Sequence, residues 1–469
     1  MIKYTDIIAC ESVLKFSEIN EKISGDGYNV TTDSRAIRGR NCFIALHGEK
    51  FNANTFIKDL AEDVNLVIFC KKNNDDEGFD ALVKKFPKNT FVEVTDTYKY
   101  ILELGRLISS RWQSAGGQMI AVTGSNGKTT NKEMLYALFS EVFPGLVHKT
   151  RGNLNNHIGV PLTLFELSES DKVCVAEMGM NHAGELAPLA KAIAPTAGLI
   201  TSIGPAHLEF LGSIENIFKE KKVLFDWIDN SDSSSKTFVL RENDNFLKIL
   251  PERTWCKRLS KSDYELIKNG FKVLIDDRWH EVQNENLLGD HNKENMIQSL
   301  FLATDLYPEH YEKFLIAASN FQMPKMNRGD FFINEKVTIY LDAYNANPGS
   351  MKSSLNAFFE HCEASTVTMD KRLFILGDMN ELGDESAAMH SEIGQFLKLN
   401  KAENALFIGQ YSKNYAAGFG DGAQQCEDVD KLKKYLRNKQ DNYSAIFIKG
   451  SRSLQLESLI DINGRLNLN

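Results

Sequence analysis

The segment from Met119 to Thr130 constrains the fold of this chain more than any other part of the sequence. It opens with an apolar, β-branched run that ends at Thr123, which predicts a buried strand. Small residues follow in Gly124-Ser-Asn-Gly127, and Lys128-Thr-Thr130 then begins a stretch with helical apolar spacing. A strand, a glycine turn and a lysine at the start of a helix are together typical of a phosphate-binding loop.

This loop has the features that hold the phosphates of a nucleotide triphosphate. Backbone N–H groups and the helix N-terminus face the anion, the lysine neutralises it, and the Thr129 hydroxyl can hold Mg²⁺. The usual pattern has a glycine where this chain has Val122, and a glycine stands at position 124 instead. An ordinary strand–turn–helix with a surface lysine is the alternative. The residues predicted to contact the nucleotide are Gly124, Ser125, Asn126, Gly127, Lys128, Thr129 and Thr130.

Length and composition limit the class of protein. A chain of 469 residues is too long for one hydrophobic core, so two or three domains are expected. The net charge of −9 argues against a broad basic surface, and hence against a nucleic-acid partner. The seven cysteines are scattered and never spaced as metal ligands, which predicts reduced thiols in a cytoplasmic protein. We find no signal-peptide pattern and no apolar run of transmembrane length, so no membrane association is expected.

Strand and helix signals alternate along the chain, which predicts an α/β fold with parallel sheets. We expect three domains, at residues 1–95, 96–325 and 326–469. An amphipathic helix at Tyr98–Trp112 begins the second domain, and a linker at Met323–Arg328 precedes the third. The predicted strands are residues 42–46, 65–70, 119–123, 172–176, 197–202, 338–341, 372–376 and 444–448.

Polar residues follow several of these strands, and in a parallel sheet they share the rim where ligands bind. Glu177 and His207 follow strands of the same block as the phosphate-binding loop. Glu177 is an oxygen ligand suited to Mg²⁺ beside phosphates. His207 is less usual for magnesium, and by itself its position is more typical of a hydrogen-bonded turn residue.

Lys221 interrupts the apolar side of a predicted helix. It lies on the same face as Ile214, Ile217, Phe218, Leu224 and Phe225, whereas Lys219 and Lys222 lie on the other side. A buried lysine is costly unless it is neutral or paired, and a neutral amine can add carbon dioxide to form a carbamate that binds magnesium. The alternative is a lysine whose long side chain reaches solvent at the rim.

Two further pairs of residues leave alternatives open. Ser34 and Arg35 lie in a predicted loop and either bind a diphosphate or form a solvated turn. Asn292 and Asn295 lie three residues apart on one helix face, where two amides either contact an adenine edge or serve as a cap and a surface residue.

Taken in order, these motifs resemble those of the Mur ligase family of bacterial peptidoglycan synthesis. The Tyr344-Asn-Ala-Asn-Pro348 and Lys449-Gly-Ser-Arg452 forms resemble the member that adds a dipeptide. The family member that adds the third amino acid has motifs similar to Tyr-Ala-His-Thr-Pro and Lys-Gly-His-Glu at these two positions. One departure is Asn52-Ala-Asn54, where the family tends to have Asp-Gly-His. The other matching motifs are Asp33-Ser-Arg35, Thr123–Thr130, Gly152-Asn-Leu-Asn-Asn156, Glu177-Met-Gly, His207-Leu-Glu, His291-Asn-Lys-Glu-Asn295, Gly377-Asp-Met and Glu381-Leu-Gly383.

The resemblance implies a UDP-sugar-binding N-terminal domain, a central ATP-binding domain and a Rossmann-like C-terminal ligase domain. It also implies a reaction in which ATP converts the terminal carboxylate of UDP-N-acetylmuramoyl-tripeptide into an acyl phosphate, which the amine of D-alanyl-D-alanine attacks. Such an enzyme needs positioning and charge neutralisation around the γ-phosphate, and closure of its domains to exclude water. It is expected to act as a monomer in the cytoplasm.

The resemblance also implies roles for individual residues. Lys128, His207 and Lys221 are expected to be catalytic. Of two magnesium ions, Thr129 and Glu177 are expected to hold one, and His207 and carbamylated Lys221 the other. Asn292 and Asn295 are expected to contact adenine, and Arg328, Asp342, Tyr344 and Asn345 to complete the ATP site from the third domain. The residues expected to bind the UDP-sugar peptide are Ser34, Arg35, Asn155 and Asn156.

Two rival functions remain from the sequence. Folylpolyglutamate synthase or another Mur ligase would share the amide-forming fold, and a phosphate-loop switch would bind nucleotide without ligase activity. The strand-end polar clusters of the third domain weigh against a switch. The third residue of the acceptor peptide, meso-diaminopimelate or lysine, and the residues that bind D-alanyl-D-alanine are not assigned by the sequence.

Overall fold

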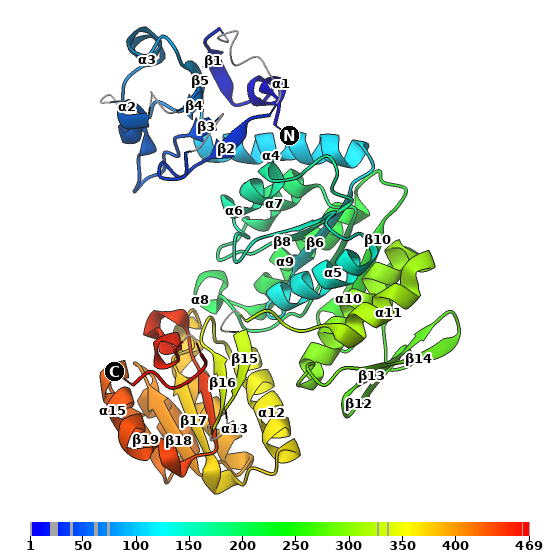
Figure 1. The fold of residues 1–469 in the computed structure, drawn as a ribbon, viewed down its shortest axis with the longest axis vertical. Helices are drawn as coiled ribbons and strands as arrows, with labels where there is room; N and C mark the ends of the chain where they lie inside the picture. Colours follow the sequence, from blue (N-terminus) through cyan, green and yellow to red (C-terminus); the bar gives the residue numbers. More distant parts are fainter. Residues whose placement is uncertain are drawn as a thin grey trace.

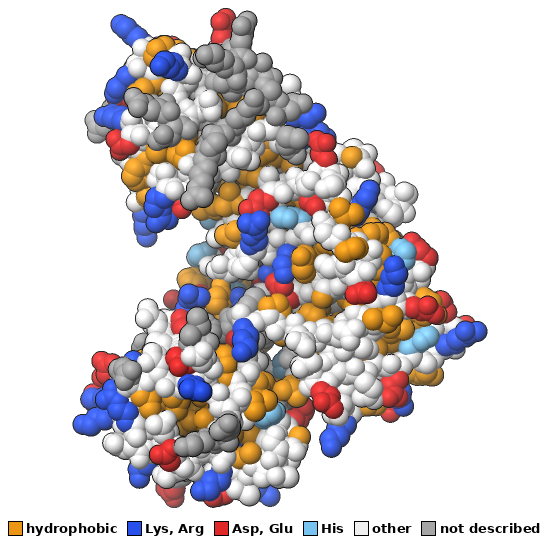
Figure 2. All heavy atoms as spheres, in the orientation of Figure 1, with side chains coloured by type: hydrophobic (Ala, Val, Ile, Leu, Met, Phe, Trp, Pro, Cys, Tyr) orange, Lys and Arg blue, Asp and Glu red, His pale blue; other side chains and the backbone are white. Residues whose placement is uncertain are grey.

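Three α/β lobes follow one another in a curved row in the computed structural model (Figure 1). The structure describes residues 2–18, 27–37, 41–60, 64–72, 76–325, 328–334, 337–461 and 463–468. We call the lobes N-terminal, middle and C-terminal after the sheets that they contain. On the face shown in Figure 2, an indentation along the middle lobe separates the N-terminal lobe from the C-terminal lobe. The predicted α/β fold with parallel sheets is confirmed.

The N-terminal lobe contains a five-stranded sheet in the order β1-β5-β4-β3-β2, in which only β1 is antiparallel to its neighbour. The central strand β4 is buried along its whole length, as its continuous apolar sequence predicts. The strands are β1 Val13–Phe16, β2 Asn29–Thr31, β3 Asn41–Ile44, β4 Leu66–Phe69 and β5 Thr90–Val94, and the helices are α1 Tyr4–Ile8, α2 Ile57–Leu60 and α3 Phe79–Lys85.

Helix α4, Thr97–Ser114, joins the N-terminal and middle lobes. It begins where the Asp96 carboxylate accepts hydrogen bonds from two backbone N–H groups, and it matches the predicted amphipathic helix closely. Tyr100 and Leu104 pack into the N-terminal core, whereas Trp112 belongs to the core of the middle lobe. Because α4 contributes to both cores, the domain boundary at residue 95 stays a prediction.

The middle lobe contains a six-stranded parallel sheet in the order β11-β10-β9-β6-β8-β7. Strand β6 lies at its centre between β8 and β9, so the residues that follow these three strands share one rim, as the sequence predicted. The strands are β6 Gln118–Thr123, β7 Val147–Lys149, β8 Val173–Glu177, β9 Ala197–Ile200, β10 Thr237–Arg241 and β11 Cys256–Leu259. The helices are α5 Lys128–Val142, α6 Gly159–Phe165, α7 Leu186–Ile193, α8 Leu208–Leu211, α9 Ile214–Asp229, α10 Asp290–Leu306 and α11 Tyr311–Asn320.

A small antiparallel sheet extends the middle lobe between β11 and α10. Its strands are β12 Tyr264–Ile267, β13 Gly270–Ile275 and β14 Arg278–Gln283, and they lie in sequence order. Phe271 and Val273 on β13 pack into the same core as Met134 and Leu138 of α5. This sheet therefore covers the α5 and α10 side of the lobe.

The C-terminal lobe contains a six-stranded sheet in the order β15-β16-β20-β17-β18-β19, in which only β15 is antiparallel. The strands are β15 Arg328–Ile333, β16 Thr338–Asp342, β17 Arg372–Gly377, β18 Asn404–Ile408, β19 Ala423–Cys426 and β20 Ala445–Lys449. The helices are α12 Pro348–Ala364, α13 Ser386–Leu399, α14 Ser412–Phe419 and α15 Val429–Lys439. The three strands predicted in this lobe are confirmed as β16, β17 and β20.

Three sequence predictions concern features outside the sheets. The linker prediction at Met323–Arg328 falls partly on residues 326–327, which lie outside the described residues, and Arg328 is already the first residue of β15. All seven cysteines are buried and unpaired. Across the part of the chain that the structure describes, no helix combines the length and the apolar character that crossing a membrane requires.

Candidate active site

The phosphate-binding loop between β6 and α5 requires glycine at two positions. Gly124 has φ +150°, and a Cβ there would lie 1.8 Å from the Thr201 Oγ1 atom. Gly127 has φ +79° and precedes the first residue of α5, with the Asn295 amide 3.1 Å from where its Cβ would be. A side chain at either position would force the loop away from β9 or α10.

The loop is supported from β9 and open toward the start of α5. The Ser125 N–H donates to the Ser202 carbonyl at 2.8 Å, and the Asn126 N–H donates to the Ser202 hydroxyl at 3.3 Å. The N–H groups in the first turn of α5 have no carbonyl partner within the helix. They make the helix N-terminus a site for an anion, as the sequence predicted for a phosphate.

Lys128 bends back over this loop. Its Nζ donates to the carbonyl oxygens of Gly124 at 2.8 Å and Ser125 at 3.4 Å. Desolvation lowers the pKa of Lys128, an effect that Glu177 and Glu381 partly oppose. These two carboxylates belong to the middle and C-terminal lobes, so Lys128 lies where charges from both lobes act on it.

Glu177, at the end of β8, faces the loop as predicted. It is 1% exposed, and its Oε1 accepts hydrogen bonds from the Thr129 hydroxyl at 3.2 Å and the Asn155 amide at 2.7 Å. Its Oε2 is buried without a hydrogen-bond partner. A hydroxyl and a carboxylate oxygen beside a phosphate site fit the donor set of Mg²⁺, which binds proteins through few ligands together with phosphates and water. The described residues contain no group of three or more acidic, histidine or cysteine side chains that could hold a metal by themselves.

Lys221 is buried in the interior of the middle lobe. It is 1% exposed on α9 among Ile217, Leu224 and Phe225, on the apolar face where the helical spacing put it. Within the described chain its Nζ has no hydrogen-bond or ion-pair partner. Desolvation lowers the pKa of Lys221 well below its ordinary value, and the nearby Lys128 charge lowers it further. An amine in this setting has a strong tendency to be neutral.

His207 contacts the C-terminal lobe. It has a left-handed backbone conformation with φ +59° before α8, and its Nδ1 lies 2.5 Å from the Glu381 carboxylate. This hydrogen bond is the main cause of the lowered pKa of Glu381. The backbone carbonyl of Glu381 also accepts a hydrogen bond from the Glu209 N–H. The described contacts do not bring His207 together with Lys221, so their sharing of a second magnesium ion stays a prediction.

Two contacts from the C-terminal lobe reach the phosphate-binding loop. The Arg328 guanidinium donates to the Thr129 hydroxyl at 2.7 Å, and it lies 3.7 Å from the centre of the Tyr344 ring. The Asn347 amide donates to the Asn126 side-chain oxygen at 2.7 Å. Both lobes therefore border the same loop.

Asp342 and Asn345 support the residues that make these contacts. The Asp342 carboxylate forms an ion pair with the buried Lys449 and accepts a hydrogen bond from Ser354 at 2.8 Å. Lys449 also donates to the Asn345 carbonyl at 3.0 Å. These bonds hold the segment after β16 in place, and with it Tyr344.

Two family models match the chain in succession. The Mur ligase middle domain matches residues 122–303, and the Mur ligase, glutamate ligase domain matches residues 327–452. The chain belongs to the Mur ligase family. It is 29% identical over 464 residues to the UDP-N-acetylmuramoyl-tripeptide–D-alanyl-D-alanine ligase of Bacillus subtilis (strain 168), with 92% of each chain covered.

Solved structures show the same fold. Crystal structure I of MurF from Acinetobacter baumannii has a TM-score of 0.75 at 24% identity, covering 92% of this Mur ligase and 91% of that chain. The MurF ligase of Thermotoga maritima in complex with ADP has a TM-score of 0.73 at 21% identity, covering 94% and 97% of the two chains. These likenesses span all three lobes.

The two asparagines predicted to contact adenine lie at the start of α10 in this Mur ligase. Asn295 is buried against Gly127, next to the phosphate-binding loop. The Asn292 amide donates to the Leu288 carbonyl at 2.8 Å, which helps to support the first turn of the helix. Neither contact tests the adenine role, which stays a prediction.

The residues predicted to bind the peptide substrate lie in different places. Asn155 contacts Glu177 directly, whereas the Asn156 side chain accepts the N–H groups of Ile158 and Gly159 at the start of α6. Asn156 therefore has a local capping role in this structure.

Ser34 and Arg35 lie in the N-terminal lobe. Arg35 is exposed and forms two hydrogen bonds of 2.9 Å with the Asp33 carboxylate, which lower the pKa of Asp33 to about 2. Asn52 and Asn54, which depart from the family pattern, bind within the same lobe: their amides donate to Asp76 and to the Cys70 carbonyl, each at 2.8 Å. The structure thus shows ordinary surface and loop contacts for these residues.

Sequence reasoning missed Lys132 and Thr150. Lys132 is fully buried next to Glu177, and the Thr150 hydroxyl accepts the Glu177 N–H at 3.0 Å. Lys132 could have been found, because it lies three residues after Thr129 and therefore on the same side of α5. The sequence contains no comparable signal for Thr150.

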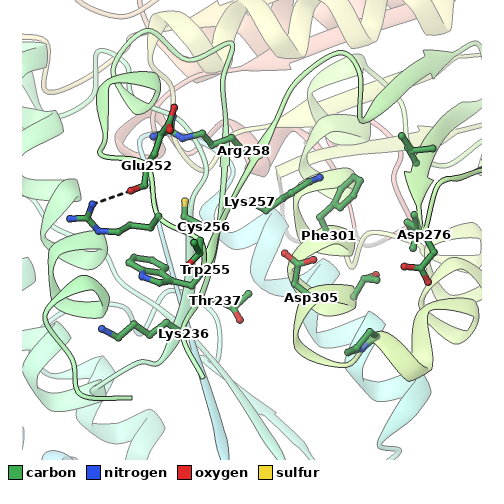
Figure 3. Close-up of a pocket in the computed structure, with 16 residues that line it drawn as sticks. Lys236, Thr237, Glu252, Trp255, Cys256, Lys257, Arg258, Asp276, Phe301 and Asp305 are labelled. Atoms are coloured by element: carbon green, nitrogen blue, oxygen red, sulfur yellow. Dashed lines mark hydrogen bonds between the residues drawn. The ribbon is translucent and has the colours of Figure 1, made fainter. Parts of the chain in front are cut away.

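A cavity of about 730 Å³ lies at the opposite rim of the middle sheet (Figure 3). Thr237 and Cys256, the first residues of the parallel strands β10 and β11, line it, whereas the phosphate-binding loop follows the last residue of β6. Lys257 in this cavity is already paired with Asp263 at 2.7 Å. None of the predicted site residues lines it.

Proposed function

We propose that this protein is an ATP-dependent ligase that adds D-alanyl-D-alanine to UDP-N-acetylmuramoyl-tripeptide in the cytoplasmic synthesis of peptidoglycan precursors. The Bacillus subtilis relative bears the name of this activity, and it aligns along nearly the whole of both chains. The Tyr344–Pro348 and Lys449–Arg452 motifs agree with a dipeptide-adding ligase.

The observation that carries the proposal is the environment of Thr129. Its hydroxyl contacts Glu177 from the middle lobe and Arg328 from the C-terminal lobe. A nucleotide bound at this loop would therefore touch two lobes, as a ligase requires when it encloses a reactive phosphate. A phosphate-loop switch has no need of the polar C-terminal surface that borders the loop.

The first step converts the terminal carboxylate of the tripeptide into a better acyl donor. A carboxylate oxygen attacks the γ-phosphorus of ATP, the bond to the β-phosphate oxygen breaks, and ADP leaves. The helix N-terminus of α5, Lys128 and Arg328 supply the positive charge that this transfer requires. The D-alanyl-D-alanine amine then attacks the acyl carbon, and the tetrahedral intermediate loses phosphate and the amine proton.

Residues of this chain suit the magnesium ions that such a ligase uses. Thr129 and Glu177 would hold one ion, and His207 with carbamylated Lys221 the second. The burial and lowered pKa of Lys221 support this modification, because only a neutral amine adds carbon dioxide. His207 would have to exchange its present partner Glu381 for the metal. When bound, the ions neutralise the phosphate charge and hold it in position for transfer.

The remaining roles belong to the same proposal. ATP binds Gly124–Thr130, with Asn292 and Asn295 at the adenine, and the protein acts as a monomer. The N-terminal, ATP-binding and ligase domains comprise residues 1–95, 96–325 and 326–469. The residues that complete the ATP site are Arg328, Asp342, Tyr344 and Asn345, and those that bind the UDP-sugar peptide are Ser34, Arg35, Asn155 and Asn156.

The deciding experiment measures ADP release with and without D-alanyl-D-alanine, and identifies the product by mass. Two UDP-N-acetylmuramoyl-tripeptides are compared, one ending in meso-diaminopimelate and one in lysine. We expect ADP release to require both substrates and to accompany amide formation. Amide formation with a folate and glutamate, but not with the muramoyl substrates, would favour folylpolyglutamate synthase. Nucleotide exchange without any amide product would favour a switch.

A further inference from the structure

Lys132 is a buried lysine that connects the metal-facing carboxylate to a neighbouring loop. It is 0% exposed on α5, and its Nζ donates to the Gly152 carbonyl at 3.1 Å. The same atom lies 3.2 Å from Glu133 Oε1 and 3.7 Å from Glu177 Oε2. One ammonium group therefore lies against both the loop after β7 and the carboxylate at the end of β8.

The charges around Lys132 balance. Glu133 also forms an ion pair with Lys149 on β7, so two lysines and two glutamates make up one group. Lys132, Glu133 and Glu177 are all nearly inaccessible to solvent, whereas the Lys149 side chain is 25% exposed. A fully buried ammonium group persists only when such partners surround it.

The loop of residues 152–156 is linked to Glu177 directly by one hydrogen bond to Oε1 and indirectly through the ion pair between Lys132 and Oε2. The Asn155 amide donates to Oε1, the oxygen that also accepts the Thr129 hydroxyl. Lys132 joins Oε2 to the Gly152 carbonyl from the other side. A shift of Glu177 toward the phosphate-binding loop would therefore move the 152–156 loop with it.

We propose that Lys132 is a positioning residue that couples the 152–156 loop to Glu177, so that a nucleotide with magnesium at the phosphate-binding loop tightens binding of the peptide substrate. This inference rests on the proposed function, in which Asn155 and Asn156 belong to the peptide site. Lys132 itself touches neither substrate in this scheme.

The test compares Lys132→Met with Lys149→Met by titration calorimetry on the whole protein. Lys149→Met is the matched control, because it removes a cation of the same group that contacts neither Glu177 nor Gly152. In one pair of titrations the probe is ADP, with and without Mg²⁺. In the other pair it is UDP-N-acetylmuramoyl-tripeptide, with and without ADP and Mg²⁺ together. We expect ADP and Mg²⁺ to tighten tripeptide binding by about 10-fold in the wild type, within the usual range of coupling.

In Lys132→Met we expect this factor to fall below about 2, while ADP binding without Mg²⁺ changes by less than about 3-fold. Lys149→Met should keep the wild-type factor. If Lys132→Met does not fold, the charge-balanced Lys132→Met/Glu133→Gln variant takes its place, with the same expectation. A loss of packing alone would lower the melting temperature without changing the ratio of the two tripeptide affinities.

Two results would overturn the inference. A wild-type coupling factor in a folded Lys132 variant would show that the lysine does not transmit the effect, and would leave the proposed function intact. Failure of the wild-type protein to bind the tripeptide under any condition would reject the proposed function together with the inference.

Discussion

Replacing Lys221 by Met should stabilise the protein and abolish its activity. Lys221 is 1% exposed, has no ion-pair partner within the described chain, and has Lys128 as a nearby like charge. The wild-type fold must therefore either bury a charge or hold the amine neutral, and both are unfavourable. Met has a similar length and no charge, so it fits among Ile217 and Leu224 without this cost.

The expected gain follows from comparable replacements of buried charged groups by apolar side chains. Replacing a buried ion pair by apolar side chains is neutral or stabilising by about 1–4 kcal/mol, and we expect about 1–3 kcal/mol for this single buried amine. For a lobe of this size that corresponds to roughly 2–4 °C in melting temperature for each kcal/mol. The matched control is Lys222→Met, on the partly exposed side of α9, which loses only an i,i+4 pair with Asp226 and should change stability by less than about 0.5 kcal/mol.

Tryptophan fluorescence suits this measurement, because all four tryptophans of the chain lie in the middle lobe. Urea unfolding in carbon-dioxide-free buffer gives the difference in stability, and ADP release with both substrates gives the activity. Lys221→Ala should also be inactive, and short carboxylic acids should restore part of its turnover by occupying the place of the carbamate. A Lys221→Met protein that is less stable than wild type, or one that retains full activity, would refute the reasoning.

Three further predictions concern the loop, the interface between lobes and the response to acid. Lys128→Met should lower turnover by at least about 100-fold with an unchanged tryptophan melting curve, and retention of most of the turnover would contradict the role of this lysine at the phosphate. Asn347→Ala removes the hydrogen bond to the Asn126 side chain and should raise the KM for ATP by about 5-fold. The scattering profile of the wild type should contract when nucleotide and tripeptide bind. An unchanged KM or an unchanged profile would argue against closure of the lobes. Burial lowers the pKa of His291 from 6.5 to about 4. Below about pH 6.5 the unfolded chain therefore binds a proton that the folded chain excludes. The free energy of unfolding should fall by about 1–2 kcal/mol as the pH is lowered from 7 to 5. His291→Asn should remove most of this loss in urea titrations at the two pH values, and an unchanged pH dependence would show that other groups cause it.

The local order of the elements could be predicted from the sequence, because the signals for it are themselves local. An apolar β-branched run followed by glycines and a lysine specifies the strand, the turn and the helix of the phosphate-binding loop within a dozen residues. The helical repeat likewise put Lys221 on the buried side of α9, although it left open whether the amine reached solvent. That question depended on how deeply the neighbouring elements cover the helix.

Contacts between distant segments were decided only by the tertiary structure. Arg328 and Thr129 are 199 positions apart, and Asn126 and Asn347 are 221 apart, so no periodic pattern relates them. The pairing of Lys132 with Glu177 also needed the fold, because a buried lysine is tolerated only where other elements supply its partners. Sequence thus determined which residues lie at the ends of strands and on the buried faces of helices. The packing of the lobes determined which of them meet, because hydrogen bonds and ion pairs depend on distances in space that separation along the chain does not set.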